Sequence, residues 1–383
     1  MENRIIYWFR NDLRLDDNEA FWTAAGDATE LLPVYVFDPR RFRLRDLGFR
    51  KTGLNRAYHI LDAVRNLQER LQEKQGDLII RVGEPEKIIA DLAKLHQVAE
   101  VRASKEITLE ETNVEASLSK RLKGINVDIS LTWMSTLIHP HDLPVYISRL
   151  PEEYGRFAEL TRQTPVRKPL PGQEAIPFMT GETGSVLPDL RELGFGEEEL
   201  KAGKNPDVRS ITEAELKSRV ASGEAGTEEF LNWVSDGLIS PRLAYHHTSG
   251  TPLGAALYEQ LSWRDYLQFL ALKYGTRLFK PSGLVHRIDK EWKYDRESFH
   301  QWKDGKTSDP EVNRSMEALG AKGVLGFGES KVAAQHLIGE LGVNWTWGAA
   351  WFESQLMNYE VALNWGIWNY FAGVGPGKME DIL

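Results

Sequence analysis

Segment 358–370, NYEVALNWGIWNY, combines asparagines with large aromatic rings in a stretch whose composition favours a helix. Asn364 and Trp368 are four residues apart, so they would lie on one face of that helix. An amide and an indole on a shared face could contact a flat, light-absorbing cofactor. The alternative is ordinary core packing, in which the amide finds one internal partner. Taken alone, the segment leaves both interpretations open.

Other residue types capable of chemistry give weaker signals. The chain has no cysteine, which excludes disulfides, thiolate nucleophiles and cysteine metal sites. His246 and His247 are adjacent, so on a helix their side chains diverge and make a poor metal pair. His139 and His141 lie in an expected loop without a cluster of further ligands. We therefore predict no metal site.

Length and charge limit the domain organisation and the kinds of partner that the protein can have. The chain has 383 residues, suited to two or three domains, and a net charge of −9. Residues 181–230 contain twelve acidic and six basic residues, whereas residues 231–383 contain seventeen and fifteen. Because the acidic excess is concentrated in one segment, a basic groove elsewhere stays compatible with nucleic acid. Without a signal-peptide pattern or a membrane-length apolar run, we expect a soluble cytoplasmic protein.

The first 132 residues alternate between short apolar runs and helical stretches, the clearest of which covers residues 53–74. The runs are RIIYWF, LLPVYVF, DLIIRV, AEVRA and INVDISL, which begin at Arg4, Leu31, Asp77, Ala99 and Ile125. This alternation predicts a doubly wound, five-stranded parallel sheet flanked by helices. Ligands of such sheets bind beyond the carboxyl ends of the strands. That edge should carry Arg10, Asn11, Asp38 and Arg40.

The rest of the chain has a different character. Residues 133–210 are rich in Pro, Gly and Thr and predict a long ordered connector. From about residue 211 the pattern is helical to the end. We therefore predict an α/β domain at 1–132, a connector at 133–210 and an all-helical domain at 211–383.

Several long motifs resemble the cryptochrome/photolyase family, most closely its DASH branch. They include YWFRNDLRLDDNEA, LPVYVFDPRRF and KTGLNRAYHILDAVRNLQERL near the N-terminus, and WRDYLQFLALKYG and NWTWGAAWFESQLMNYEVALNWGIWNY near the C-terminus. The resemblance covers most of residues 3–160 and 231–375. It implies an antenna-type α/β domain followed by an all-helical domain of the kind that binds FAD.

The resemblance also implies roles for individual residues. The family's electron relay of three tryptophans matches Trp302, Trp345 and Trp368, expected as a line from the surface to the centre of the helical domain. The asparagine that faces the flavin N5 matches Asn364, although core packing remains the alternative. Glu106 matches an acidic position near a pterin-type antenna (a folate); its alternative is a solvated acid that starts a helix. Substrate positions match Gln260, Trp263 and Arg264, where glutamine replaces a family glutamate.

Other positions depart from the family pattern on the phosphate side. The family receives the FAD pyrophosphate with a hydroxyl-rich loop, which here reads GTEEFLN at 226–232. Thr227 and Leu231 occupy matching positions, and Glu228 and Glu229 stand where phosphates are received. Phosphate sites favour N–H groups, hydroxyls and cations, so two carboxylates should repel the pyrophosphate.

The flavin-ring side is altered as well. A family arginine and its partner aspartate are both missing: Phe327 and Ser330 lie in the element that carried the arginine, Asn358 replaces the aspartate, and Glu360 replaces the next aspartate. Losing both partners of a buried pair can be nearly neutral, whereas losing one strands a charge. The paired loss therefore predicts a repacked, folded site with fewer contacts to FAD.

Three functional hypotheses follow. The protein is a flavin-dependent blue-light photolyase or cryptochrome that repairs pyrimidine dimers in single-stranded DNA, a light sensor, or a non-catalytic descendant that binds nucleic acid or another partner. The altered residues favour a DASH-like homologue that binds FAD weakly or not at all. The sequence leaves open whether the protein is an enzyme; if active, it would be a deoxyribodipyrimidine photolyase-type lyase.

Overall fold

The computed structural model describes residues 3–181, 185–202, 213–222 and 226–377. Within these limits the chain forms two compact units. Unit 1 comprises residues 1–42, 58–139 and 165–261, and unit 2 comprises residues 43–57, 140–164 and 262–383. The predicted division into 1–132, 133–210 and 211–383 follows secondary-structure content, whereas the compact units follow packing.

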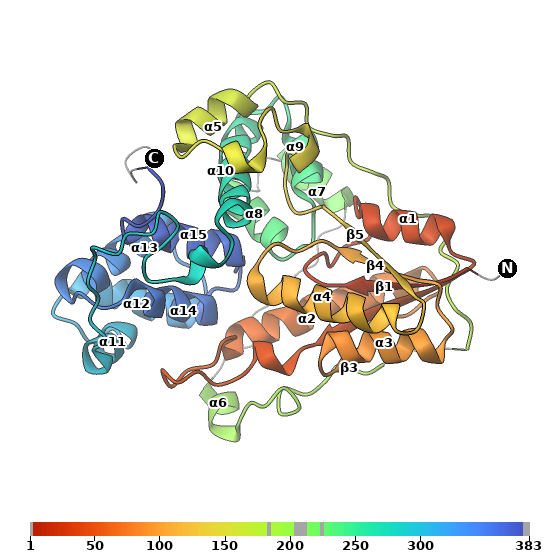
Figure 1. Cartoon of the computed structure of the whole chain (residues 1–383), viewed down its shortest axis with the longest axis horizontal. Coiled ribbons are helices and arrows are strands. Elements are labelled where there is room, and N and C mark those ends of the chain that lie inside the picture. Colours follow the sequence, from red (N-terminus) through yellow and green to blue (C-terminus); the bar gives the residue numbers. More distant parts are fainter. Residues whose placement is uncertain (1–2, 182–184, 203–212, 223–225, 378–383) are drawn as a thin grey trace. The chain divides into compact units, whose positions relative to one another are not determined.

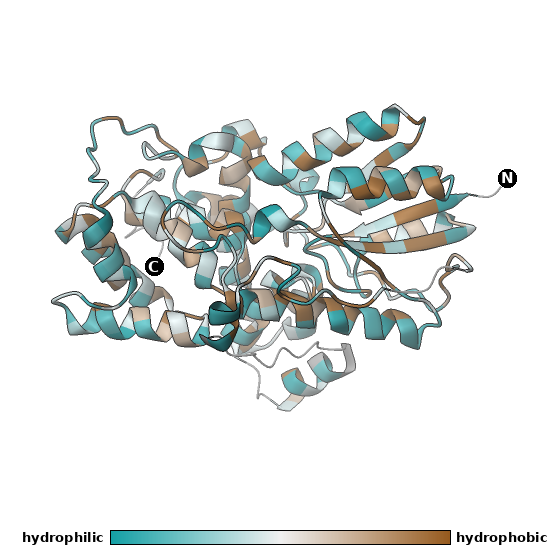
Figure 2. Cartoon of the chain, turned by 90° about the horizontal axis from the view of Figure 1, so that it is seen from below, coloured by the Kyte–Doolittle hydropathy of each residue, from teal (hydrophilic) through white to brown (hydrophobic). Residues whose placement is uncertain are grey.

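Unit 1 is built on the predicted five-stranded parallel sheet, with strand order β3-β2-β1-β4-β5 (Figure 1). The strands are β1 (Arg4–Phe9), β2 (Glu30–Phe37), β3 (Ile79–Val82), β4 (Glu100–Ser104) and β5 (Asp128–Thr132). Strands β1 and β2 are almost entirely buried apolar runs, as expected for central strands covered on both faces. Figure 2 shows brown bands along the strands of the sheet, while the helices alternate between teal and brown.

Helices cover the sheet because its side chains alternate between two faces. Ile6 and Trp8 of β1 belong to the apolar core that includes Ile89 of α3 and Leu118 of α4. Tyr7 points the other way, and its ring lies 5.1 Å from that of Phe21 in α1. The helices of this sheet are α1 (Glu19–Asp27), α2 (Leu54–Glu73), α3 (Pro85–Leu95) and α4 (Leu109–Lys123).

Strand β5 begins three residues later than predicted from INVDISL. Asn126 has φ +55°, a left-handed conformation that extended strands do not contain. The Val127 N–H donates to the Leu122 carbonyl at 3.0 Å, which closes the end of α4. Residues 125–127 therefore belong to the turn that follows α4, and the strand starts at Asp128.

The predicted connector contributes short elements and one sheet-edge contact. Its elements are the 3₁₀ turns η2 (Pro140–Asp142) and η3 (Ile147–Arg149) and the helices α5 (Tyr154–Thr161) and α6 (Glu197–Ala202). Leu31 accepts from the Met179 N–H at 3.0 Å and donates to the Pro177 carbonyl at 2.6 Å. Because β3 pairs only with Val34–Phe37 of β2, this part of the connector covers the start of β2.

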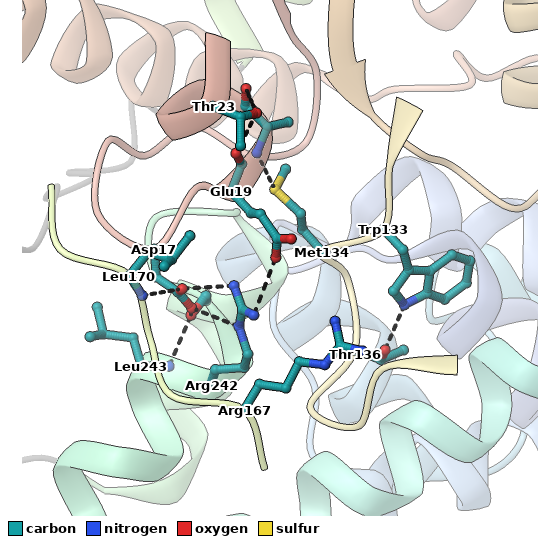
Figure 3. A network of polar contacts seen from close by, with 12 residues as sticks. Asp17, Glu19, Thr23, Trp133, Met134, Thr136, Arg167, Leu170, Arg242 and Leu243 are labelled. Carbon is teal, nitrogen blue, oxygen red and sulfur yellow. Dashed lines mark hydrogen bonds and ion pairs between the residues drawn. The ribbon is translucent and has the colours of Figure 1, made fainter. Parts of the chain in front are cut away.

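Three helices follow the connector in unit 1, α7 (Glu213–Ser222), α8 (Thr227–Ser235) and α9 (Pro241–Thr248), and a buried ion pair fixes the last of them. Asp17 is fully buried and accepts from Arg242 at 2.7 and 3.1 Å (Figure 3). Asp17 also accepts from the Leu170 N–H at 2.9 Å. Arg242 therefore ties α9, and with it the α8–α9 turn, to the loop after β1.

Unit 2 is helical, as predicted: no β-strand occurs in the described residues between 231 and 375. Besides α5, η2 and η3 of the connector, its helices are α10 (Pro252–Tyr274, which starts in unit 1), η4 (Gly275–Phe279), α11 (Arg296–Lys303), α12 (Pro310–Lys322), α13 (Phe327–Gln335), the π-helix η5 (His336–Glu340), α14 (Trp345–Gln355) and α15 (Val361–Phe371). Asp295, Asp309 and Asn344 cap α11, α12 and α14 through their side chains. Across the described chain, no helix has the length and apolarity to cross a membrane.

Candidate functional site

The carboxyl end of β2 carries two of the predicted edge residues, and they bind each other. Arg40 lies 2.7 Å from Asp38 and 2.8 Å from Glu86 of α3. The hydrogen bonds that Arg40 donates to Asp38 and Glu86 raise the pKa of Arg40 further above its ordinary value. This trio is a closed ion cluster that holds η1 (Pro39–Arg41) against α3.

The carboxyl ends of β1 and β4 lie side by side and form a second cluster, here called the sheet-edge site: Arg10, Asn11, Lys105, Glu106 and Glu115. Glu115 of α4 is buried and accepts from Arg10 at 2.6 Å and from the Glu106 N–H at 2.9 Å. Lys105 also bonds to Glu115. Glu115 is thus fully neutralised.

Glu106 has a different environment from Glu115. Its carboxylate accepts from the Asn11 side-chain amide at 3.2 Å. Burial raises the pKa of Glu106 to about 7; Arg10 opposes this shift, and the nearby acids Glu111, Asp12 and Glu115 add to it. The predicted antenna residue is therefore a half-buried acid that changes charge near neutral pH.

The first turn of α8 contains the residues predicted to face the FAD phosphates. Gly226 is the N-cap and contributes no side-chain cap, so Glu228 and Glu229 occupy the second and third helical positions. Glu228 is exposed, while Glu229 pairs with Arg219 of α7 at 2.7 Å. The Arg219 guanidinium also lies 5.4 Å from the ring of Trp233. Acids in a first turn stabilise a helix through its dipole, which explains their local fit.

Thr227 and Leu231 flank these acids on the same helix. Both are half-buried, and they stand at the first and fifth positions of α8. One turn apart, they lie on one face of α8. The role of both residues in cofactor binding stays a prediction.

Asn364 and Trp368 lie one turn apart on α15, and both are buried. The Asn364 amide nitrogen donates to the Ala349 carbonyl of α14 at 2.9 Å. The Trp368 ring packs 5.1 Å from that of Phe352. Asn364 thus has the single internal partner that the core-packing alternative requires.

The turn before α15 brings together a predicted cofactor residue and a predicted substrate residue. Glu360, the N-cap of α15, accepts two hydrogen bonds from Arg264 of α10, at 2.7 and 2.6 Å. The two side chains are 14% and 6% exposed, so the pair is largely hidden from water. Asn358 lies in the same turn.

The remaining substrate-side residues lie on α10. Gln260 is exposed, and Trp263 is half-buried. The Trp263 ring lies 5.5 Å from that of Tyr370 and 5.0 Å from that of Tyr154. Trp263 is therefore the edge of an aromatic cluster rather than an isolated stacking surface.

Helix α13 carries Phe327 and Ser330. Phe327 is the first residue of the helix, and its ring lies 5.7 Å from that of Phe371 in α15. Ser330 is half-buried and stands one turn after Phe327. The packing of α13 against α15 thus uses an aromatic contact at the position where the family pattern has a polar element.

The predicted tryptophan line differs from the observed arrangement. Trp302, Trp345 and Trp368 are all at most 1% exposed, so none of the three provides a surface end. The Trp302 and Trp368 rings are 6.3 Å apart, while Trp345 lies 6.0 Å from Trp365. Trp302 is buried because α11 packs its indole N–H onto the Ala333 carbonyl.

Trp292 and Trp365 extend this set and were missed from the sequence. The indole N–H groups of Trp345 and Trp292 donate to the same carbonyl, that of Pro281, at 3.0 and 3.1 Å. Trp292 is half-buried and so reaches the surface of unit 2. The C-terminal enrichment in tryptophan was the available signal, but sequence spacing does not reveal which indoles share an acceptor.

Comparison with known proteins decides the family. Residues 5–172 match the family model for DNA photolyase, and residues 257–381 match that for the FAD binding domain of DNA photolyase. Cryptochrome DASH of Gloeobacter violaceus is 34% identical over 397 residues, spanning 97% of this chain and 79% of that protein. Cryptochrome DASH of Xenopus laevis is 33% identical, spanning 98% and 78%. The chain belongs to the DASH cryptochrome/photolyase family.

A solved structure agrees with this assignment. The crystal structure of a Synechocystis sp. cryptochrome superposes with a TM-score of 0.88 at 29% identity, covering 99% of this chain and 84% of that one. A class III photolyase from Agrobacterium tumefaciens shares the fold, with a TM-score of 0.77 at 21% identity.

The two family models cover the candidate residues unevenly. The match to the FAD binding domain includes Asn364, Glu360 and the tryptophans of unit 2. The predicted phosphate-side segment, Thr227–Leu231, lies within residues 173–256, which neither matched range contains. The relatives above nevertheless align over nearly the whole chain, so these ranges do not distinguish the ring-side from the phosphate-side positions.

Proposed function

We propose that this DASH-family protein has a remodelled flavin site that binds FAD weakly or not at all. The observation that carries the proposal is the first turn of α8, where Glu228 and Glu229 stand at the predicted phosphate position. A pyrophosphate is an anion and needs N–H donors, hydroxyls or cations there. Within the segment 226–232, Thr227 is the one residue with a side-chain hydroxyl. The residues present do not fit the phosphates of FAD.

Arg219 changes the electrostatics without restoring a phosphate site. It neutralises Glu229, yet its guanidinium is engaged by that same carboxylate at 2.7 and 3.1 Å. Glu228 remains exposed beside the helix N-terminus. Two like charges 4 Å apart repel by about 1 kcal/mol in water and about 4 kcal/mol at an effective dielectric constant of 20. Each 1.4 kcal/mol weakens binding about tenfold.

The ring side supports the same proposal through its internal partners. The Asn364 amide donates to Ala349, and Glu360 is held by Arg264. A bound flavin would have to break these hydrogen bonds or use the polar atoms that they leave available. Removing a hydrogen-bond partner from a buried polar group costs about 1–3 kcal/mol, so such competition is unfavourable.

With FAD binding reduced, the remaining functions are light-related or binding functions. We propose a pterin-type ligand, a folate, at the sheet-edge site, where Glu106 offers a carboxylate to ring N–H groups. We also propose modest, strongly salt-dependent binding of single-stranded DNA near Trp263, since aromatic rings stack bases and basic residues contact phosphates.

A second candidate function is an FAD-dependent blue-light photolyase or cryptochrome that repairs pyrimidine dimers. The observation that favours it is the retained group of closely packed tryptophans, Trp302–Trp368 and Trp365–Trp345, in the region that matches the FAD binding domain. FAD would supply light absorption and electron transfer if bound.

The test is the colour of the purified protein, followed by titration with FAD. We expect no flavin absorption after purification and weak binding of added FAD. Replacing Glu228→Ser together with Glu229→Ser should increase FAD affinity at least about tenfold if two repulsive contacts are removed. The matched control is Glu297→Ser with Glu311→Ser, which removes two acids from the first turns of α11 and α12. Stoichiometric FAD in the purified protein would overturn the proposal and support the second candidate.

A further inference from the structure

The sheet-edge site occupies the point where the strand order reverses. The sheet has the order β3-β2-β1-β4-β5. From β1 the chain adds β2 and β3 on one side, and it then returns to the other side of β1 to add β4 and β5. Ligands of doubly wound sheets bind beyond the carboxyl ends of the strands at this switch point. Asn11 follows β1 and Glu106 follows β4, so their side chains meet there, 3.2 Å apart.

Two glutamates of this site have opposite environments. Glu115 is 4% exposed and neutralised by Arg10 and Lys105. Among the described residues, the hydrogen bond to the Glu106 carboxylate comes from Asn11, a neutral amide. An ionised carboxylate has two oxygens and about four acceptor positions, so Glu106 keeps capacity for two further N–H donors.

The charged groups around Glu106 nearly balance. Arg10 and Asp12 face it from the end of β1, Glu111 and Glu115 from α4, Lys105 from the end of β4, and Arg41 from η1. Because Arg10 and Lys105 are engaged by Glu115, Glu106 has no strong ion-pair partner of its own among these groups. Its ionised form is therefore costly until a ligand supplies hydrogen bonds.

We propose that ligand binding at the sheet-edge site is proton-linked through Glu106. The ionised carboxylate accepts two N–H bonds from the 2-amino-4-oxo edge of a pterin, whereas the protonated carboxyl loses this paired acceptor. Binding to the protonated protein releases one proton from Glu106 to solvent. This inference rests on the proposed pterin site and adds that pH regulates it. Pterin binding is favoured above neutral pH and is lost below it.

The direction follows from burial. Burial raises the pKa of Glu106 to about 7, so the free site is mostly protonated at pH 6 and mostly ionised at pH 8. A ligand that binds the ionised form alone should therefore lose affinity about tenfold per pH unit below the midpoint and reach a plateau above it. Hydrogen bonds from the ligand to the carboxylate lower the pKa of Glu106 in the complex.

The experiment is a fluorescence titration of the full chain with pterin (2-amino-4-oxopteridine) between about pH 6 and pH 7.5, where the pterin ring keeps the N3–H that the carboxylate must accept. Glu106→Gln should weaken binding at the higher pH and abolish the pH dependence. Glu111→Gln is the matched control on the same rim; it removes a neighbouring negative charge, so it should keep the pH dependence and move its midpoint to lower pH. Calorimetry in two buffers of different ionisation enthalpy should detect about one released proton at the lower pH.

The outcomes separate the inference from the site on which it rests. Pterin binding with the same affinity across this pH range, in the natural protein and in Glu106→Gln, would overturn the proton linkage and leave a pterin site. Absence of binding at every pH would overturn both. A pH dependence that survives in Glu106→Gln would assign the titration to another group and overturn the role of Glu106.

Discussion

Two glutamate–arginine pairs stand near helix starts, and they differ mainly in exposure. In unit 1, Glu229 at the start of α8 pairs with Arg219, and the side chains are 33% and 39% exposed. In unit 2, Glu360 at the start of α15 pairs with Arg264, and the side chains are 14% and 6% exposed. Both pairs have contacts of 2.6–2.7 Å, so geometry alone does not separate them.

Burial decides what each pair does. An exposed pair competes with water and salt, so it contributes little and can be exchanged for a ligand or another side chain. A buried pair is held by its surroundings, because neither partner regains water when the other is removed. The α15 start should therefore be a fixed structural element, while the α8 start is the part of the chain where binding properties can change.

The largest expected effect comes from Glu360→Gln. This change removes the Glu360 counter-charge from the buried Arg264 guanidinium and should lower the free energy of unfolding by about 3–5 kcal/mol. Asp289→Asn is the matched control, since Asp289 pairs with Arg287 at 64% and 48% exposure; it should cost less than about 1 kcal/mol. Urea denaturation followed by circular dichroism measures both.

A double variant sharpens this test. Arg264→Met with Glu360→Leu removes both charges of the pair and should recover most of the stability lost in Glu360→Gln, because neither member of the pair is left behind without the other. If Glu360→Gln is no more damaging than Asp289→Asn, the contrast between the buried and the exposed pair is wrong.

The second effect concerns the packing of α15 itself. A Cβ on Gly348 of α14 would lie 2.3 Å from Trp368 and 2.6 Å from Leu337, inside the core of unit 2. Gly348→Ala should therefore destabilise by about 1–3 kcal/mol through overpacking. Gly320→Ala in α12 is the control, since its Cβ would meet nothing within 4 Å; it should stabilise by about 0.5–1 kcal/mol. Equal behaviour in thermal unfolding would contradict the close packing of α14 and α15.

The sequence predicts the sheet well because each strand is encoded locally. Runs such as RIIYWF and LLPVYVF carry their burial pattern within six or seven residues, and they lie in β1 and β2. The predicted start of β5 was wrong because Asn126 adopts a left-handed backbone conformation. The pattern of apolar residues does not reveal such a conformation. Boundaries therefore depend on backbone details that hydrophobic periodicity does not contain.

The candidate site is less predictable because its contacts join distant segments. Arg264 and Glu360 are 96 residues apart, and each was identified separately for a different role. Arg219 was not identified at all, although it neutralises one of the two acids on which the phosphate argument rests. Family resemblance identifies which sequence positions belong to the site. Which charged side chains already have an ion-pair partner depends on how the helices pack.

The smallest expected effect tests the exposed pair. Glu229→Gln removes the ion pair with Arg219 and part of the favourable interaction with the α8 dipole, so it should cost about 0.5–1 kcal/mol, and less at high salt. Arg219→Gln also loses the contact with the Trp233 ring, 5.4 Å away, and should cost slightly more. Arg191→Gln, which breaks the exposed contact with Glu197, is the matched control. Urea denaturation at low and high salt should place all three variants within about 1.5 kcal/mol of the natural protein. A loss from Glu229→Gln as large as that from Glu360→Gln would show that the α8 start is as fixed as the α15 start, and would remove the basis for treating it as adaptable.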